Sequence, residues 1–150
     1  MIGITGGSEV LRLLDRVTLQ TGLYRQLIVC SPYLDATMCD RLADLAARVD
    51  RERSHLSIIT TPSTITNTMN TRDLRTHGRI RVTGLPGLHA KFYLAIGRDA
   101  RLTEAILTSA NCTVAGTTAN IELGIRMAAS TPSSARIIED IDRFARRIMT

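Results

Sequence analysis

The sequence is poor in aromatic residues, since its 150 residues include no tryptophan, three tyrosines and two phenylalanines. Proteins that hold single-stranded nucleic acid by stacking its bases need several exposed aromatic rings. Membrane-binding surfaces also rely on aromatic and apolar side chains, and the sequence shows no aromatic cluster that could provide one. The composition therefore argues against a base-stacking platform. If nucleic acid is bound, contacts to the phosphate backbone are the expected mode.

Cysteine is scarce too. Cys30, Cys39 and Cys112 form no CxxC pair and have no histidine at a metal-ligand spacing. An odd number of cysteines argues against a disulfide framework. We therefore expect three small buried side chains in a reducing cell interior, and neither a metal ion nor another cofactor.

Long apolar runs are missing. No stretch approaches the roughly 18 apolar residues of a membrane span, and residues 1–7 lack the basic and apolar regions of a secretory signal. The sequence therefore predicts a cytoplasmic protein with no membrane association.

Positive charge is in excess, with a net charge of +5 at pH 7 and an isoelectric point near 9.7. This balance suits a polyanionic partner, because lysine and arginine release counterions when they neutralise phosphates. Two groups of arginines are explained either by nucleic-acid contact or by a solvated surface. They are Arg72, Arg75, Arg79 and Arg81, and then Arg136, Arg143, Arg146 and Arg147.

The pattern of apolar residues predicts a single α/β domain spanning residues 1–150. The early order of strand, helix and strand implies a right-handed parallel crossover. We therefore expect a layered α-β-α architecture with a mixed, mainly parallel central sheet flanked by helices. The predicted strands are residues 26–31, 56–60, 79–83, 89–96, 105–109 and 121–127.

Three amphipathic helices are predicted from apolar stripes at helical spacing. Ser8, Asp35 and Thr131 are the candidate N-caps, and Pro132 suits the first position of the last helix. Gly22 is expected to end the first helix. Residues 62–76 are rich in threonine, serine and asparagine, which indicates a partly helical excursion.

Residues 88–96 carry the most informative pattern. Alternate residues of a strand leave the same face, so His89, Lys91 and Tyr93 share one face, whereas Phe92 and Leu94 take the opposite, buried face. A potential nucleophile and a fixed cation can thus converge on one phosphate. The other two histidines, at positions 55 and 77, have no lysine two residues on and are expected to be ordinary surface or boundary residues.

Polar residues that could complete this site follow in the sequence. Ser109 and Asn111 have the same two-residue spacing where the next strand gives way to a turn, and their donors suit the non-bridging oxygens of a phosphodiester. Imidazole is abundant in its neutral, nucleophilic form near neutral pH because its ordinary pKa is about 6.5. Glu122 could accept the other ring N–H and fix the tautomer. The candidate catalytic residues are His89, Lys91, Ser109, Asn111 and Glu122.

The order and spacing of these residues resemble the signature of the phospholipase D superfamily. That signature is His-x-Lys, then Gly or Thr, Ser, any residue and Asn, and then a downstream Asn-x-Glu. The match runs through His89, Lys91, residues 108–111 and residues 120–122. Residues 27–33 and 84–88 also resemble segments of this family's domains, so that the resemblance covers nearly the whole chain.

One position departs from the family pattern. The usual aspartate lies five residues after the lysine, where this chain has Ile96, and the nearest acid is Asp99. The resemblance implies that this aspartate mostly supports structure while the histidine attacks, and small stand-alone nuclease-like members also lack it. We therefore keep His89 as the nucleophile and assign no role to Asp99.

The resemblance implies a two-step displacement that needs no metal. One histidine attacks phosphorus to form a phosphohistidine, and a second protonates the leaving oxygen and then activates water. Because the chain has one His-x-Lys, the second histidine must come from another subunit. We expect a homodimer with one active site on its two-fold axis. The alternative is a larger partner that carries the other motif.

The preferred hypothesis is a nuclease, a phosphodiesterase with DNA in preference to RNA as substrate. The first alternative is a lipid phosphodiesterase of the phospholipase D type, although the sequence lacks an aromatic cluster for membrane contact. The second is a non-catalytic nucleic-acid-binding module of a restriction, repair or defence assembly, against which the intact set of site residues argues.

Overall fold

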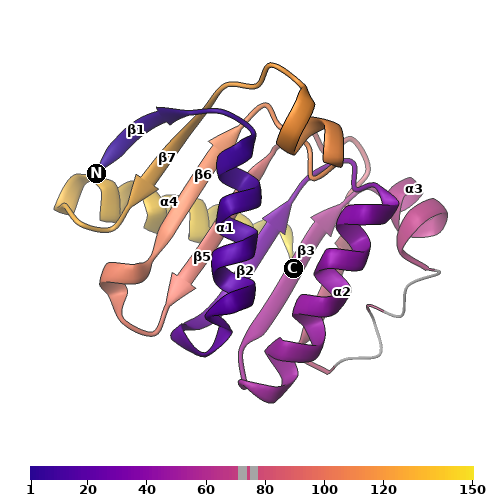
Figure 1. Cartoon of the computed structure of the whole chain (residues 1–150), viewed down its shortest axis with the longest axis horizontal. Helices are drawn as coiled ribbons and strands as arrows, with labels where there is room; N and C mark the ends of the chain where they lie inside the picture. Colours follow the sequence, from indigo (N-terminus) through magenta and orange to yellow (C-terminus); the bar gives the residue numbers. More distant parts are fainter. Residues whose placement is uncertain (71–73, 75–77) are drawn as a thin grey trace.

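The computed structural model describes residues 1–70, 74 and 78–150 of the chain. Within these residues the chain forms a seven-stranded sheet with the order β1-β7-β6-β5-β2-β3-β4 (Figure 1). The strands are β1 (Ile2–Thr5), β2 (Tyr24–Cys30), β3 (His55–Thr60), β4 (Ile80–Gly84), β5 (Phe92–Gly97), β6 (Glu104–Thr108) and β7 (Gly124–Ala128).

The sheet is mixed, and the α/β class with helices flanking a mixed sheet is confirmed. Strands β2, β3 and β4 are parallel neighbours, whereas the other neighbouring pairs are antiparallel. Five strands run in one direction, and β5 and β7 run in the other. The expectation of a mainly parallel sheet therefore holds for strand direction but not for hydrogen-bonded pairing. The reason is that reversed strands are inserted between β2, β6 and β1, and each creates two antiparallel pairs.

Helices cover both faces of the sheet. Helices α1 and α2 pack on one face, and α4 crosses the other (Figure 1). The longer helices are α1 (Ser8–Leu19), α2 (Ala36–Arg51) and α4 (Pro132–Ile148). The short helical segments are α3 (Pro62–Thr64), η1 (Thr21–Leu23), η2 (Ile65–Met69), η3 (Ala100–Leu102) and η4 (Ala115–Ala119). None of the helices among the described residues is long and apolar enough to span a membrane.

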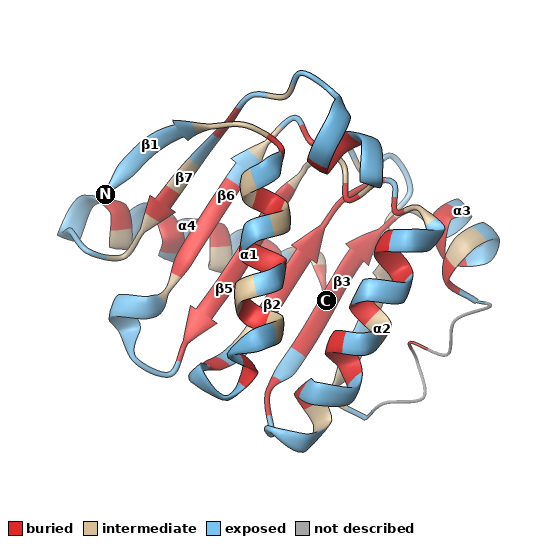
Figure 2. Ribbon diagram, in the orientation of Figure 1, coloured by how far each residue is buried: buried red, intermediate tan, exposed pale blue. Residues whose placement is uncertain are grey.

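Strand β5 is buried on both faces (Figure 2). Phe92, Leu94 and Ile96 pack in the core under α4, and Tyr93 and Ala95 pack in the core under α1 and α2. The predicted alternation of faces is therefore correct. The face that carries Tyr93 is buried as well, because α1 and α2 cover it.

Two predicted strands begin later than expected. Strand β5 starts at Phe92, so His89 and Lys91 lie in the segment before it, and β7 starts at Gly124 rather than at residue 121. At this end of β5, the outermost register pairs are those of Phe92 with Cys30 of β2 and with Leu107 of β6. The other predicted strands differ by one or two residues at their ends. The exposed edge strand β1 was not predicted.

The caps of two helices are confirmed, and one is wrong. The carboxylate of Asp35 accepts from the Met38 amide at 2.9 Å, and Thr131 forms a reciprocal capping box with Ser134. Ser8 is instead the first residue of α1, which has no side-chain cap, and the helix ends at Leu19, before Gly22.

The excursion after β3 is helical over residues 62–69, as expected, while Arg72, Arg75 and His77 lie outside the described residues. All three cysteines are buried, and none of them forms a disulfide. Burial raises the pKa of the Cys30 thiol to about 12. These findings agree with the predicted role of the cysteines as small core residues.

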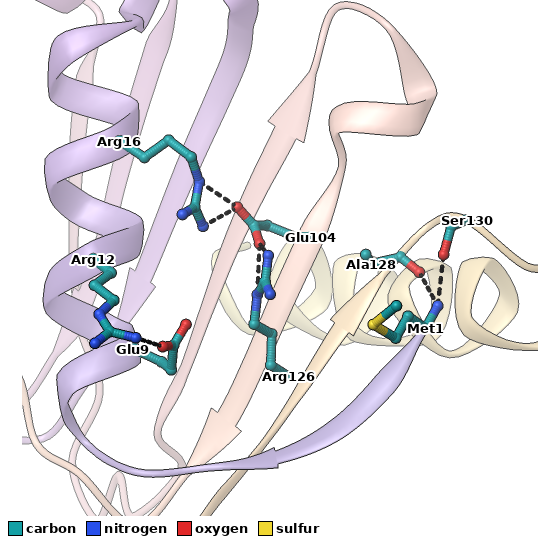
Figure 3. Close-up of polar contacts among 8 residues, drawn as sticks. All are labelled: Met1, Glu9, Arg12, Arg16, Glu104, Arg126, Ala128 and Ser130. Atoms are coloured by element: carbon teal, nitrogen blue, oxygen red, sulfur yellow. Dashed lines mark hydrogen bonds and ion pairs between the residues drawn. The ribbon is translucent and has the colours of Figure 1, made fainter.

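A buried carboxylate ties α1 to the sheet (Figure 3). Glu104, at the start of β6, has a side chain only 6% exposed and accepts from two arginines. The guanidinium of Arg16 binds Oε1 at 2.5 Å, and that of Arg126 binds Oε2 at 2.8 Å. Burial alone lowers the pKa of Arg16, but hydrogen bonding and charge attraction from Glu104 outweigh it and raise that pKa. Glu104 thus links α1, β6 and β7.

We expect Glu104→Gln to lower the free energy of unfolding by about 2–4 kcal/mol. The substitution leaves the guanidinium groups of Arg16 and Arg126 without their carboxylate partner, which destabilises a buried ion pair strongly. The loss is limited because both arginines are partly exposed and recover some hydration. Urea unfolding at neutral pH measures the change. The matched control is Asp15→Asn, whose exposed pair with Arg41 contributes at most about 1 kcal/mol. Equal effects for the two variants would contradict a structural role for Glu104.

Candidate active site

Four strand ends meet at one edge of the sheet, where the helical segment η4 (Ala115–Ala119) is drawn in orange in Figure 1. Because β5 and β7 run opposite to β2 and β6, the beginnings of the first two strands lie beside the ends of the other two. The Thr108 amide donates to the Lys91 carbonyl at 3.2 Å, and the Ser109 amide donates to the Leu123 carbonyl at 3.0 Å. The segments that carry all five predicted site residues are therefore joined at this edge.

His89 and Lys91 occupy the segment that leads into β5. The Lys91 ammonium donates to the His89 carbonyl at 3.2 Å, which holds the cation beside the histidine. The His89 side chain is exposed, and its ring makes no hydrogen bond to any described residue. The expected bond from this ring to Glu122 is therefore not formed within the described part of the chain.

Glu122 instead binds Ser109 and Asn120. The Ser109 hydroxyl donates to one carboxylate oxygen, and the Asn120 amide donates to the other at 3.4 Å. The Leu123 amide donates to Ser109 Oγ at 3.1 Å. The prediction that Glu122 orients the imidazole is thus wrong for a single copy, because the segment before β7 pairs with the end of β6 and brings the carboxylate onto Ser109.

Asn111 is held by Ser31, which follows β2. The Ser31 hydroxyl lies 3.5 Å from Asn111 Oδ1, donates to the Tyr33 carbonyl at 2.7 Å and accepts from the Cys112 amide at 2.9 Å. With Oδ1 turned toward Ser31, the amide nitrogen of Asn111 is available as a donor. Ser31 is not among the predicted site residues, although a polar residue at the end of a buried strand is a usable signal.

A close backbone approach shapes the loop after Asn111. A Cβ at Gly116 would lie 2.5 Å from the Asn111 carbonyl oxygen, so only glycine lets η4 pack against this residue. Asp35 binds the same segment, because its second carboxylate oxygen accepts from the Val114 amide at 2.5 Å. The buried Tyr93 hydroxyl donates to the Ala110 carbonyl at 3.2 Å. The position of Asn111 is therefore set by contacts from β5, α2 and η4.

The departure at Ile96 is compatible with this site. Ile96 is 4% exposed and belongs to the apolar core under α4, where an unpaired carboxylate would be costly. Asp99 lies beyond the end of β5 that is remote from His89. Hydrogen bonds from Arg101 lower the pKa of Asp99 to about 2. Neither position takes part in the site, which agrees with assigning no role to Asp99.

Besides Glu122, the carboxylate of Asp35 lies at this edge, where it accepts from backbone amides. Among residues 1–70, 74 and 78–150, no three histidine, cysteine, aspartate or glutamate side chains are grouped so that they could hold a metal ion. His55, at the opposite end of β3, is exposed and lies 3.4 Å from Arg79, as expected for a surface residue. The arrangement therefore offers a nucleophile, a cation and an amide donor, with a carboxylate that orients a hydroxyl.

Similarity to known proteins is visible in structure and not in sequence. No protein-family model matches the chain, and no curated protein matches its sequence. NucT from Helicobacter pylori has a TM-score of 0.66 at 14% identity, over 99% of this chain and 95% of that one. Nuc from Salmonella typhimurium, described as a phospholipase D family member, has a TM-score of 0.61 at 18% identity, over 97% and 93%. A variant of yeast tyrosyl-DNA phosphodiesterase 1 has a TM-score of 0.51 at 12% identity, over 85% of this chain and 32% of that one.

These similarities establish the fold. The chain has the phospholipase D-like fold, with the mixed sheet and flanking helices that the sequence signature led us to expect. Identities below one fifth leave the reaction to be argued from the site itself.

Proposed function

We propose that this protein is a metal-independent phosphodiesterase that hydrolyses nucleic acid, DNA in preference to RNA. The observation that carries the proposal is the meeting of His89, Lys91 and Asn111 with the Ser109–Glu122 pair at one edge of the sheet. An exposed imidazole can reach a phosphorus atom, while the ammonium and the amide can bind its non-bridging oxygens. The net charge of +5 and the similarity to a tyrosyl-DNA phosphodiesterase support a nucleic-acid substrate.

The reaction has two steps. In the first, a ring nitrogen of His89 attacks phosphorus, the bond from phosphorus to the leaving oxygen breaks, and that oxygen takes a proton from a second histidine. In the second, this histidine removes a proton from water, the hydroxyl attacks phosphorus, and the phosphorus–nitrogen bond breaks. Lys91 and Asn111 stabilise the negative charge that builds on the phosphoryl oxygens in both steps. A phosphohistidine is the required intermediate.

The second histidine is His89 of another copy of the chain. Each copy supplies one His-x-Lys, and a two-fold axis beside the site edge would bring the two motifs to one phosphate. The exposed His89 ring, without a bond to a described residue of its own chain, supports this arrangement. A homodimer with one shared active site therefore belongs to the proposal.

An exposed apolar strip next to the site supports the same arrangement. Ile4 of β1 lies opposite Ile125 of β7, which lies opposite Leu107 of β6. Their exposed fractions are 84%, 43% and 37%. Further along the same strands Met127 and Ala105 are buried in the core under α4, so the strip is the part of this face that α4 leaves open. Ile121 and Leu123, on either side of Glu122 in the sequence, are exposed apolar residues as well. We call the five residues Ile4, Leu107, Ile121, Leu123 and Ile125 the apolar strip.

Such a strip fits a second copy of the chain. Contiguous apolar side chains on a surface mark interaction sites, and a patch of this kind is complementary to itself across a two-fold axis. Its position beside Ser109 and Glu122 places the contact where a shared site needs it. A lipid phosphodiesterase would use the same apolar strip to contact a membrane, so the substrate test includes a lipid.

Cleavage assays in the presence of EDTA test the proposed function. We expect hydrolysis of labelled DNA, slower hydrolysis of RNA, and turnover of bis(p-nitrophenyl) phosphate. Hydrolysis confined to phosphatidylcholine vesicles would assign the protein to the lipid class. Binding of DNA without any product would leave a nucleic-acid-binding module and contradict the catalytic proposal.

A further inference from the structure

A second polar surface lies at the other end of the sheet. A cavity of about 500 Å³ opens between the starts of β3 and β4 and the C-terminal part of α4. Three arginines line it, Arg79, Arg81 and Arg146, together with Gln26 and Ser57. We call this the basic hollow. It shares no residue with the site edge.

The hollow exists because α4 does not cover the whole of its face of the sheet. Ile28 and Ile59 belong to the core under α4, and strand alternation places Gln26 and Ser57 on that same face. Ser57 pairs with Arg81 across β3 and β4, which puts this arginine on the same face. Polar side chains therefore occupy the part of this sheet face that α4 does not cover, whereas apolar side chains occupy the part under α4.

The contacts within the hollow leave it positively charged. Arg79 lies 3.4 Å from His55 Nε2, and Arg81 donates to the Met149 carbonyl. Arg146 binds the Asp142 carboxylate at 2.9 Å and lies 3.4 Å from Gln26 Oε1. In the described part of the chain, Asp142 is the one side-chain carboxylate bound to any of these three arginines.

The chemistry of the lining favours a phosphate backbone over a free nucleotide. Guanidinium groups match phosphate oxygens in geometry and charge, and the Ser57 hydroxyl and the Gln26 amide are neutral polar groups suited to the same oxygens. The described residues that line the cavity include no phenylalanine, tyrosine or tryptophan on which a base could stack, and the imidazole of His55 lies 3.4 Å from Arg79. Contacts of this type position a strand without reading its sequence.

The hollow and the site edge are separated by the length of β3. This strand has six residues, which corresponds to about 17–20 Å at roughly 3.3 Å per residue. Along duplex DNA that distance corresponds to about five or six base pairs at 3.4 Å each. We propose that the basic hollow is a second phosphate-binding subsite, which holds the backbone of the nucleic acid several nucleotides from the phosphodiester at His89. This inference rests on the proposed function for the identity of the ligand.

Binding of a fluorescein-labelled 20-base-pair duplex, followed by fluorescence anisotropy, tests the subsite. All variants carry His89→Ala, so that the duplex stays intact. The combined change of Arg79, Arg81 and Arg146 to Gln is expected to weaken binding at least tenfold at 0.1 M salt. It should also reduce the magnitude of the log–log salt slope by about 3, because three phosphate contacts are lost and each contributes about 0.9. A single Arg146→Gln variant should reduce the slope by about 1. If the triple variant unfolds, this single variant tests the subsite in its place.

The matched control changes Arg12, Arg48 and Arg51, on the α1 and α2 side of the sheet, to Gln. It removes the same charge and should leave the slope within about 0.3 of the parent's, since a distant charge makes no phosphate contact. Equal losses in the two triple variants, or no duplex binding at all, would overturn the subsite. Arginine-dependent binding of ATP or pyrophosphate without an effect on the duplex would also overturn it. Turnover of bis(p-nitrophenyl) phosphate by the chain with His89 intact tests the proposed function separately.

Discussion

Replacing His89 by alanine is expected to lower the rate of phosphodiester hydrolysis at least about 10³-fold. The substitution removes the nucleophile from one copy and the proton donor from the other, and the loss of a nucleophile or its base has effects of this size or larger. Because the His89 side chain is exposed and unbonded to the described residues, the free energy of unfolding should change by less than about 0.5 kcal/mol. Hydrolysis of bis(p-nitrophenyl) phosphate and thermal unfolding measure the two quantities.

A trapped intermediate distinguishes nucleophilic attack from general base catalysis. Quenching the wild-type protein with SDS at alkaline pH during turnover of ³²P-labelled DNA should leave label on the protein. Acid treatment should then release the label, because a phosphorus–nitrogen bond is labile to acid and stable to base. The His89→Ala variant should carry no label. The matched control is Arg12→Gln, an exposed residue of α1. Unchanged hydrolysis by His89→Ala would contradict the assignment of the site.

Replacing Ile125 by aspartate in the apolar strip is expected to produce a monomer and to lower activity by about 10²- to 10⁴-fold. A charge at this position faces its own copy across the two-fold axis, and desolvating it is costly. The monomer then lacks the second histidine, whose acid and base catalysis is of this magnitude. Light scattering at the assay concentration measures the oligomeric state alongside the rate.

The control for this variant is Leu19→Asp. Leu19 is also apolar and highly exposed, but it ends α1 on the other side of the sheet. We expect it to leave both the dimer and the rate unchanged. An Ile125→Asp variant that is monomeric and fully active would show that one copy carries a complete site. A monomeric wild-type protein that binds phosphatidylcholine vesicles through the strip would favour the lipid reaction.

The fold could be predicted from the sequence to the extent that local patterns determine it. The apolar run around Val29 and the helix caps at Asp35 and Thr131 could be predicted because each depends only on residues close to it in the sequence. The strand ends could not be located in the same way. Strand β5 begins at Phe92, where its register with β2 and β6 begins, and that register involves residues that are in part tens of positions away in the sequence. Strand β1 has only four residues, and its two alternate isoleucines, Ile2 and Ile4, are too short a pattern to predict a strand.

For the candidate site, the sequence predicted the right segments but not all of their contacts. The spacing of His89 and Lys91 predicted that the two residues lie close together, because both belong to one short segment. The bond of Glu122 to Ser109 and the support of Asn111 by Ser31 depend on how β2, β6 and β7 meet at one edge. The basic hollow was beyond the sequence pattern too, since it depends on where α4 stops covering the sheet.

The central claim is that the edge carrying His89 is half of a shared phosphodiesterase site. Mixing equal amounts of wild-type and His89→Ala chains, with full exchange of subunits, tests it most directly. Random pairing makes about one quarter of the dimers fully wild type. The account predicts about one quarter of the hydrolysis rate of the same total concentration of wild-type protein in EDTA. A rate of about one half would show that each copy works alone and would contradict the claim.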